Sequence, residues 1–286
     1  MLTVLVTGVA LGSIYAGVAL VYNLMFSTTR VLSITAGHAC MLGGVFGAYF
    51  VKELGLPVVP GLLATLCVGA ACGWITEVIG IRRILGRSDQ HLWILSTLAL
   101  ATIIQQSVGL WWGTEPKQFP RLVPQDFSAG LGDQKFWLPA IAAVAVVASL
   151  EVLYRRTLYG KLFLAVSEDA FAALARGVAV RQVRAASYAL AGAVGALIGF
   201  AAGQLTFAYF ALGLTLTLNG FIALAVGGLG SNLGALVGGL ILGLISASTT
   251  YFFGGEYQNT ISTSILIAIL LLKPEGLFGG KAVRQV

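Results

Sequence analysis

The chain has 286 residues, of which 58% are hydrophobic and only 10% are charged, whereas an ordinary soluble domain carries roughly 25% charged residues. This composition excludes a soluble globular protein and predicts an integral membrane protein. The net charge of +6 does not indicate nucleic-acid binding, because the basic residues gather at the ends of hydrophobic segments, where they set membrane orientation.

Nine hydrophobic segments follow one another along the chain. They lie near residues 2–26, 31–51, 57–80, 91–112, 137–154, 185–209, 213–230, 233–253 and 259–272. Continuous apolar runs of this length favour α-helices over the alternating strands of a barrel, since a spanning helix needs about 20 residues. We therefore expect an all-α integral membrane protein, a polytopic bundle of eight or nine hydrophobic segments that forms one domain over residues 1–286.

The segments at 31–51 and 213–230 contain many glycine and polar residues, so we expect broken or re-entrant helices there. Glycines can release backbone groups inside a membrane, which is tolerated only where protein or a water-filled cavity satisfies them. His38 is interpreted as a buried imidazole bonded to a backbone carbonyl or, alternatively, as a substrate contact. Polar groups inside a membrane protein usually face protein or a cavity. The candidate substrate-pathway residues are Gly37, His38, Gln105 and Asn219.

The distribution of basic residues favours an N-out, C-in orientation. In that orientation 13 of the 17 basic residues are cytoplasmic, as the positive-inside rule prefers. These 13 are Arg30, Arg82, Arg83, Arg87, Arg155, Arg156, Lys161, Arg176, Arg181, Arg184, Lys273, Lys281 and Arg284, against Lys52, Lys117, Arg121 and Lys135 outside. The same orientation puts the loop 155–184 in the cytoplasm and the loop 113–136 outside.

A short helix of about nine residues, 168–176, is predicted within the cytoplasmic loop. An N-cap residue is followed by negative charge in the first turn, and positive charge in the last turn is followed by a glycine that suits a left-handed stop. These signals come from Ser167, Glu168, Asp169, Arg176 and Gly177.

The predicted short helix also has an apolar face. Phe171, Leu174 and Ala175 recur at the i, i+3, i+4 spacing. A capped amphipathic helix in an aqueous loop indicates a docking surface for a partner, and the alternative is a helix that packs on the underside of its own protein.

Residue patterns for catalysis are not found in the sequence. There is no G-x-x-x-x-G-K-[ST] phosphate-binding loop, no Ser/His/Asp set at useful depth, no paired-carboxylate site and no metal-ligand cluster. We therefore predict a protein that is not an enzyme, with no catalytic residues, no metal and no cofactor. An autonomous channel or facilitator for a small solute, such as urea or an amide, is the alternative to a protein driven by a partner.

Several separate motifs resemble those of one family. They are residues 12–16 (GSIYA), 30–33 (RVLS), 37–43, 165–177, 226–239 (VGGLGSNLGALVGG) and 273–279 (KPEGLFG). In this order, and spanning nearly the whole chain, they resemble the permease subunits of branched-chain amino acid ABC transporters.

The resemblance implies a subunit of an ATP-driven importer in the bacterial inner membrane, forming the pathway for a small organic solute such as a branched-chain or other amino acid. Its implied partners are a homologous second permease, in a heterodimer or a homodimer, two cytoplasmic ATP-binding subunits, an extracytoplasmic substrate-binding protein and the lipid bilayer, without nucleic acid. The ATP is then bound by the partner subunits. Residues 168–176 would form the coupling helix that docks on an ATPase, with Phe171 as its anchor.

The sequence departs from the family after its first span. This kind of permease usually reads R-V-I-N-F-A-H-G there, whereas Ser33, Ile34, Thr35 and Ala36 stand in those places and His38 follows Gly37. The wider family also imports urea, amides and aromatic acids, so the solute remains open at this stage.

Overall fold

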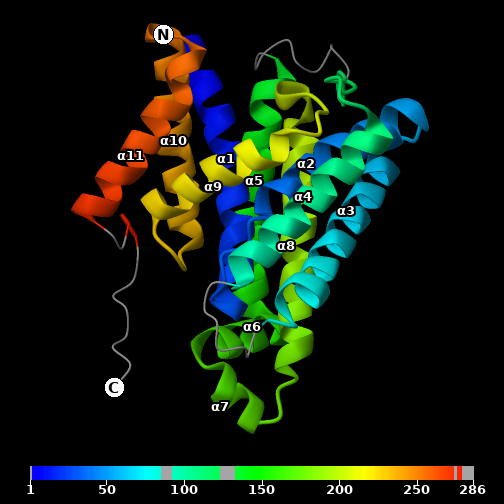
Figure 1. Ribbon diagram of the computed structural model, residues 1–286, viewed down its shortest axis with the longest axis vertical. Coiled ribbons are helices and arrows are strands. Elements are labelled where there is room, and N and C mark those ends of the chain that lie inside the picture. The colour runs from blue at the N-terminus through cyan, green and yellow to red at the C-terminus, as the bar shows by residue number, and fades with distance from the viewer. Residues whose placement is uncertain (1, 85–91, 123–132, 274–275, 279–286) are drawn as a thin grey trace.

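The computed structural model describes residues 2–84, 92–122, 133–273 and 276–278, and in these ranges the chain is helical, with one isolated bridge between Lys117 and Ala208. Figure 1 shows a bundle elongated along its helices, with the short helices α6 and α7 at one end. The elements are α1 (Leu2–Thr29), α2 (Ala36–Ala48), η1 (Tyr49–Glu53), α3 (Val58–Ile75), η2 (Thr76–Ile81), α4 (Leu92–Trp112), α5 (Gln134–Arg156), α6 (Leu158–Glu168), α7 (Ala170–Ala175), α8 (Val180–Thr206), α9 (Leu212–Gly227), α10 (Asn232–Phe252), η4 (Gly255–Tyr257) and α11 (Gln258–Leu272).

The predicted hydrophobic segments coincide with the helices α1, α2, α3, α4, α5, α8, α9, α10 and α11. In the part of the chain that the structure describes, six helical stretches are long and apolar enough to cross a membrane: α1, α3 with η2, α4, α5, α8 and α10. Helix α9 has 16 residues, and α2 has 13 before it continues as the π-helix η1. The all-α polytopic fold is confirmed, whereas the number of complete crossings stays a prediction.

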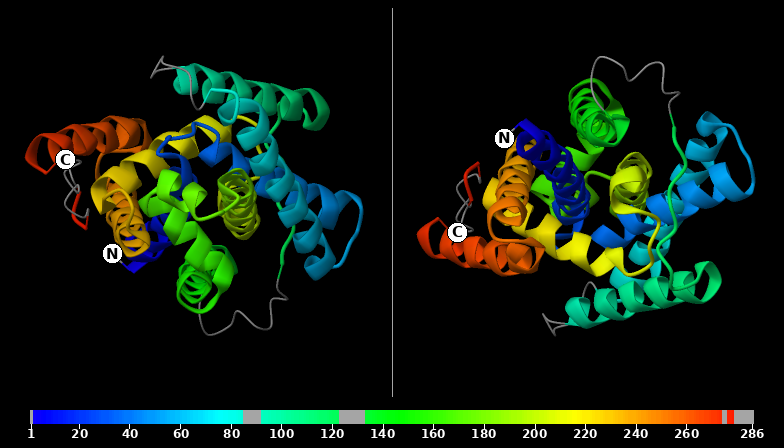
Figure 2. Two further views of the ribbon diagram at one scale, coloured as in Figure 1. Left: turned by 90° about the horizontal axis from the view of Figure 1, so that it is seen from below. Right: turned by 90° about the horizontal axis from the view of Figure 1, so that it is seen from above.

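Helices α1 and α8 form the centre of the bundle. Helix α1 packs against α10, α8, α9 and α5, and α8 packs against α3 and α2, while α4 and α11 lie at the periphery (Figure 2). The main hydrophobic core, which includes Ile14, Leu20, Tyr188 and Ile198, is made largely by these two helices. The centre is therefore closed by side-chain packing.

Glycines bring the central helices into backbone contact. A Cβ added at Gly199 of α8 would overlap the carbonyl oxygen of Cys40 in α2, and one added at Gly192 would overlap the carbonyl of Gly69 in α3. Small residues at such crossings allow close approach where lipid provides no hydrophobic drive for association. These glycines thus serve packing within the subunit.

The expectation that glycines interrupt the segment 31–51 is wrong for its middle part. Helix α2 runs without a break through Gly37, Gly43 and Gly44. Gly37 packs against α9, and a Cβ at Gly43 would overlap the carbonyl oxygen of Ala196 in α8. The glycines of α2 shorten the distance to neighbouring helices, and the backbone keeps its helical hydrogen bonds.

Basic residues separate to the two ends of the bundle. The end that carries α6 and α7 holds Arg30, Arg82, Arg83, Arg155, Arg156, Lys161, Arg176, Arg181 and Arg184, and the opposite end holds Lys52, Lys117, Arg121 and Lys135. Lys273 is the C-cap of α11, and Arg87, Lys281 and Arg284 lie outside the described residues. The direction of the bundle across the membrane stays a prediction of the positive-inside rule.

Candidate functional site

The loop 155–184 folds into two short helices at the basic end. The Oγ1 of Thr157 accepts a hydrogen bond from the backbone nitrogen of Gly160 at 3.0 Å and so caps α6. Helix α6 then continues through Ser167 to Glu168. Asp169 leaves the helical region with φ −149° and ψ 103°, and α7 begins at the next residue.

The predicted helix 168–176 is therefore wrong at its beginning. Asp169 is the N-cap of α7, because its Oδ1 accepts from the backbone nitrogens of Phe171 at 2.8 Å and Ala172 at 2.9 Å. Ser167 lies in the last turn of α6, and its hydroxyl donates to the carbonyl of Leu164. Glu168 ends α6, so it does not lie in the first turn of α7.

The end of α7 agrees more closely with the prediction. The helix stops at Ala175, and Arg176 is its C-cap. Gly177 has φ +83°, the left-handed conformation expected of a residue that terminates a helix. The whole helix has six residues, fewer than the nine that were expected.

The two large side chains of the predicted apolar face point away from the protein. Ala173 packs into a small core with Val166 and Val180, while Phe171 is 82% exposed and Leu174 is 60% exposed. An exposed phenylalanine on a rigidly capped turn has a large apolar area available for a partner. Helix α7 therefore binds its own protein through alanine and presents its two large side chains outward.

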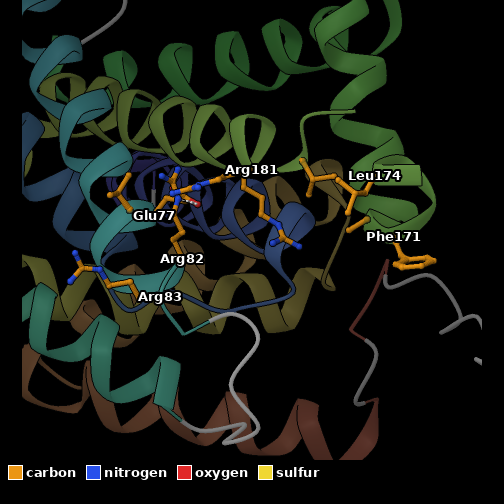
Figure 3. Close-up of a pocket in the computed structure, with 10 residues that line it drawn as sticks. Glu77, Arg82, Arg83, Phe171, Leu174 and Arg181 are labelled. Atoms are coloured by element: carbon orange, nitrogen blue, oxygen red, sulfur yellow. Dashed lines mark hydrogen bonds and ion pairs between the residues drawn. The ribbon is translucent and has the colours of Figure 1, made fainter. Parts of the chain in front are cut away.

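An open groove of about 850 Å³ lies beside these side chains. Figure 3 shows Glu77, Arg82 and Arg83 on one side of the groove and Leu174 and Phe171 on the other. Arg82 donates from Nε to Oε1 of Glu77 at 3.1 Å and from Nη2 to Oε2 at 2.6 Å. Because Glu77 is only 1% exposed, this ion pair compensates a carboxylate that water does not reach.

The α6–α7 region is tied to the end of α1. Arg30 donates from Nη2 to the carbonyl oxygen of Ser167 at 2.6 Å. Arg184, in the first part of α8, donates from Nε to the carbonyl of Thr28 at 3.2 Å. Through these two hydrogen bonds, a movement of α6 or of the start of α8 is transmitted to the connection between α1 and α2.

A second candidate site lies among α2, α4 and α9. His38 and Gln105 are 67 residues apart in sequence, and Nε2 of His38 lies 3.3 Å from Oε1 of Gln105. The His38 ring packs on Gly213, where an added Cβ would lie 2.6 Å from the ring Cδ2. The backbone nitrogen of Gly37 donates to Oγ1 of Thr217 at 3.1 Å. Three of the four candidate pathway residues thus meet in one place.

The imidazole of His38 is 2% exposed. The backbone of Ile34, four residues earlier, is a hydrogen-bond partner of the ring, as expected, and Gln105 is a second partner. Asn219, the fourth candidate, is buried and donates to the carbonyl of Thr215 in its own helix. Thr217 and Gly213 belong to this site but were not singled out from the sequence.

Two of the motifs quoted above meet in space. The backbone nitrogens of Leu277 and Phe278 donate to the carbonyls of Val226 and Gly227, both at 2.9 Å. Gly276 has φ +75°, and a Cβ added there would lie 2.5 Å from the Cα of Gly228 in the same turn. Residues 276–278 of the last motif therefore pack on the connection between α9 and α10.

The described part of the chain has six helical stretches of membrane-spanning length, a buried polar pair at a helix crossing and an exposed capped helix at the basic end. These features define a multi-pass helical membrane protein.

Comparison with known proteins identifies the family. The family model "Branched-chain amino acid transport system / permease component" matches residues 4–270. The chain is 26% identical to the high-affinity branched-chain amino acid transport system permease protein LivH of Escherichia coli (strain K12), over 98% of this chain and 96% of LivH. It is also 26% identical to BraD of Pseudomonas aeruginosa, over 99% and 97%, and to the fructose import permease protein FrcC of Rhizobium meliloti, over 85% and 69%.

Among solved structures, a chain of PsaBC from Streptococcus pneumoniae in complex with Fab has the same fold, with a TM-score of 0.54 at 13% identity over 96% of this chain and 92% of that chain. The chain belongs to the branched-chain amino acid transport system permease family. It is a transmembrane permease subunit of an ABC importer and a multi-pass protein of the inner membrane.

Proposed function

We propose that this permease carries a branched-chain amino acid, or a related small polar solute, along a pathway beside α2, α4 and α9, and that α7 couples it to a cytoplasmic ATPase. The exposure of Phe171 and Leu174 on the capped helix α7 is the observation that carries this proposal. In a chain without a phosphate-binding loop, such a surface provides the place where a partner's ATP hydrolysis can act.

Phe171 is the expected anchor of the ATPase interface. Aromatic side chains that bury fully at the centre of an interface typically contribute 2 kcal/mol or more, which corresponds to about 30-fold in affinity. Phe171→Asp should leave the folded permease intact, because the side chain makes little contact within the chain, and should abolish ATPase binding and substrate-stimulated hydrolysis in the assembled complex. Phe253→Asp is the matched control, since Phe253 is 67% exposed at the opposite end.

Normal coupling in the Phe171→Asp complex would contradict the docking role. Solute flux through the purified chain alone in liposomes, without ATPase or binding protein, would instead favour an autonomous channel.

Arg30 is the expected transmission residue. Its guanidinium joins the end of α6 to the end of α1, and α2 with His38 follows directly. Arg30→Gln should leave ATPase binding unchanged and reduce the amount of solute transported per ATP hydrolysed. A loss of ATPase binding in this variant would assign Arg30 to the docking surface. An unchanged ratio of solute transported to ATP hydrolysed would show that Arg30 does not take part in coupling.

The His38–Gln105 pair is the expected polar contact of the pathway. The imidazole of His38 and the amide of Gln105 provide hydrogen-bonding positions for a solute once the helices separate. His38→Ala and Gln105→Ala should each change the relative uptake rates of competing solutes, and their effects should not add, because the two groups are in contact. Thr102→Val is the control, since Thr102 lies on the same helix, is exposed and bonds only to the carbonyl of Leu98.

The second permease is expected on the face made by α4 and α11. Gln106 and Ser107 of α4 and Thr263 and Ser264 of α11 are exposed polar residues on apolar helices. Polar side chains in membrane segments usually face protein or a water-filled cavity, so lipid is an unfavourable neighbour for them. Cysteines introduced at Ser107 and Thr263 should form cross-links between the two permeases of the assembled importer, and cross-links confined to α3 or α5 would exclude this face.

The orientation and the remaining partners complete the proposal. With the α6–α7 end in the cytoplasm, the segment 113–122 at the opposite end faces the extracytoplasmic binding protein. Proteolysis of inside-out vesicles should therefore cleave at Arg155, Arg156 or Lys161, and right-side-out vesicles should protect them. The solute itself is best identified by ligand binding to the substrate-binding protein encoded alongside, because that protein selects the solute first.

A further inference from the structure

A second groove, of about 490 Å³, opens on the outer side of the contact between α3 and α8. Its lining joins Trp74 of α3 and Arg82 after η2 to Arg181 and a set of alanines on α8. Trp74 is 51% exposed, although it lies in a helix long and apolar enough to span the membrane. The groove is therefore part of the surface that the bilayer or another membrane protein must cover.

The groove exists because small residues follow a tight helix crossing. A Cβ at Gly73 of α3 would overlap the carbonyl oxygen of Tyr188, so the two backbones touch there. On the outer side of this crossing, α8 presents Ala186 and Ala189, whose methyl groups leave the space beside Trp74 unfilled. An apolar channel open to the side results.

Positive charge is concentrated at one end of this channel. Arg181 is exposed and has no hydrogen-bond or ion-pair partner among the residues that the structure describes. Arg82 uses Nε and Nη2 for Glu77, and its remaining guanidinium N–H groups are free to donate to an anion. Both arginines lie near the ends of their helices, at the level where the membrane surface begins. An exposed tryptophan such as Trp74 is typical of the region near that surface.

We propose that this groove binds an anionic phospholipid, whose phosphate contacts Arg181 and Arg82 and whose acyl chain lies along Trp74, Ala186 and Ala189. A cationic mouth with an apolar tail matches the chemistry of such a lipid, because arginine pairs strongly with phosphate oxygens and basic pockets between membrane helices bind anionic head groups. A helix of a partner protein would fit this groove as well as a lipid only if it carried an acidic residue directly beside an apolar stripe. Arg82 and Arg181 also line the groove beside α7, so the lipid phosphate would lie where the two grooves meet, while its acyl chain would lie on the side away from α7.

The test measures quenching of tryptophan fluorescence in the full-length chain by brominated lipids. The signal of Trp74 is the difference between the wild type and Trp74→Phe in vesicles of brominated phosphatidylglycerol or brominated phosphatidylcholine. We expect half-maximal quenching at an at least fivefold lower fraction of the anionic lipid. Arg181→Gln should reduce this preference about fivefold, the factor one basic residue supplies at a membrane surface. Ala186→Leu should weaken quenching by both lipids, because it fills the channel.

Trp111, which is 50% exposed at the opposite end of the bundle, is the matched control. Its signal, obtained with Trp111→Phe, should show no dependence on Arg181. Equal quenching of Trp74 by both lipids would overturn the proposal, because it would show that the groove contacts bilayer lipid without preference for an anionic head group. Absence of quenching of Trp74 by both lipids would overturn it too, because no lipid chain would then enter the groove.

Discussion

The ion pair between Glu77 and Arg82 should be asymmetric in its effect on stability. Glu77 is 1% exposed, whereas the side chain of Arg82 is 25% exposed. Removing one partner of a buried pair typically costs 3–5 kcal/mol, because the other charge is left without compensation. For Arg82→Gln we expect about 3 kcal/mol, the lower end of this range, since Arg82 itself is partly exposed and the pair is not fully buried. For Glu77→Gln we expect a smaller loss, because an unpaired Arg82 can turn toward water.

The assay is the midpoint of thermal unfolding of the purified chain in detergent, at one fixed scan rate. With roughly 2–4 °C per kcal/mol for a protein of this size, Arg82→Gln should lower the midpoint by about 6–12 °C. The double variant Glu77→Gln/Arg82→Gln should recover most of this loss, because no buried charge then remains. The neighbouring Arg83→Gln is the control and should change the midpoint by less than about 2 °C, as for most exposed positions.

Two results would refute this reasoning. If Glu77→Gln lowered the midpoint more than Arg82→Gln, burial of the carboxylate could not be the source of the asymmetry. If the double variant were as unstable as the sum of the two single variants, the stabilisation would come from separate contacts of each side chain. In either case the pair would not form the buried electrostatic unit described above.

Three further predictions concern helix α7, the glycines of α2 and a buried asparagine. Asp169→Ala should destabilise α7 by about 1 kcal/mol and speed amide hydrogen exchange in that helix about fivefold. Ser167→Ala should leave the exchange rate of α7 unchanged. Equal effects of the two variants would mean that Asp169 is not the cap. Gly43→Ala should lower the midpoint of thermal unfolding by several degrees, because the added Cβ has no room. Gly44→Ala should keep or raise the midpoint, since the nearest atoms to its added Cβ are 3.7 Å away. The opposite order of the two variants would contradict the close crossing of α2 and α8. Asn23→Leu should cost about 1–3 kcal/mol, because it removes the buried bonds to the turn before α10, and a stability equal to the wild type would show that water replaces them.

The hydrophobic segments and the family were predictable from the sequence. Long uncharged apolar runs form helices in the membrane, because every backbone polar group in lipid must form its hydrogen bond within the chain. The stop of α7 at Gly177 was predictable for a similar reason, since the left-handed conformation there suits glycine. These features depend on local chemistry and on the bilayer as solvent, and both can be read along the chain.

Local signals failed where two of them competed. Ser167 and Asp169 are both acceptable N-caps by residue type, but α6 continues through Ser167, and Arg30 of α1 holds the carbonyl there. The partner that holds Ser167 comes from α1, more than 130 residues away, so it cannot be inferred from a short window of sequence.

A helical membrane permease, the positions of its helices and a candidate docking helix in the loop 155–184 follow from the amino-acid sequence alone. The pairing of His38 with Gln105, the ion pair of Glu77 with Arg82 and the outward position of Phe171 become visible only in the assembled bundle. The physical reason is that helix formation and membrane insertion depend on residues close in sequence, whereas burial and pairing depend on which helices cross. Those crossings are set by glycine contacts between segments more than 100 residues apart, such as Gly199 with Cys40.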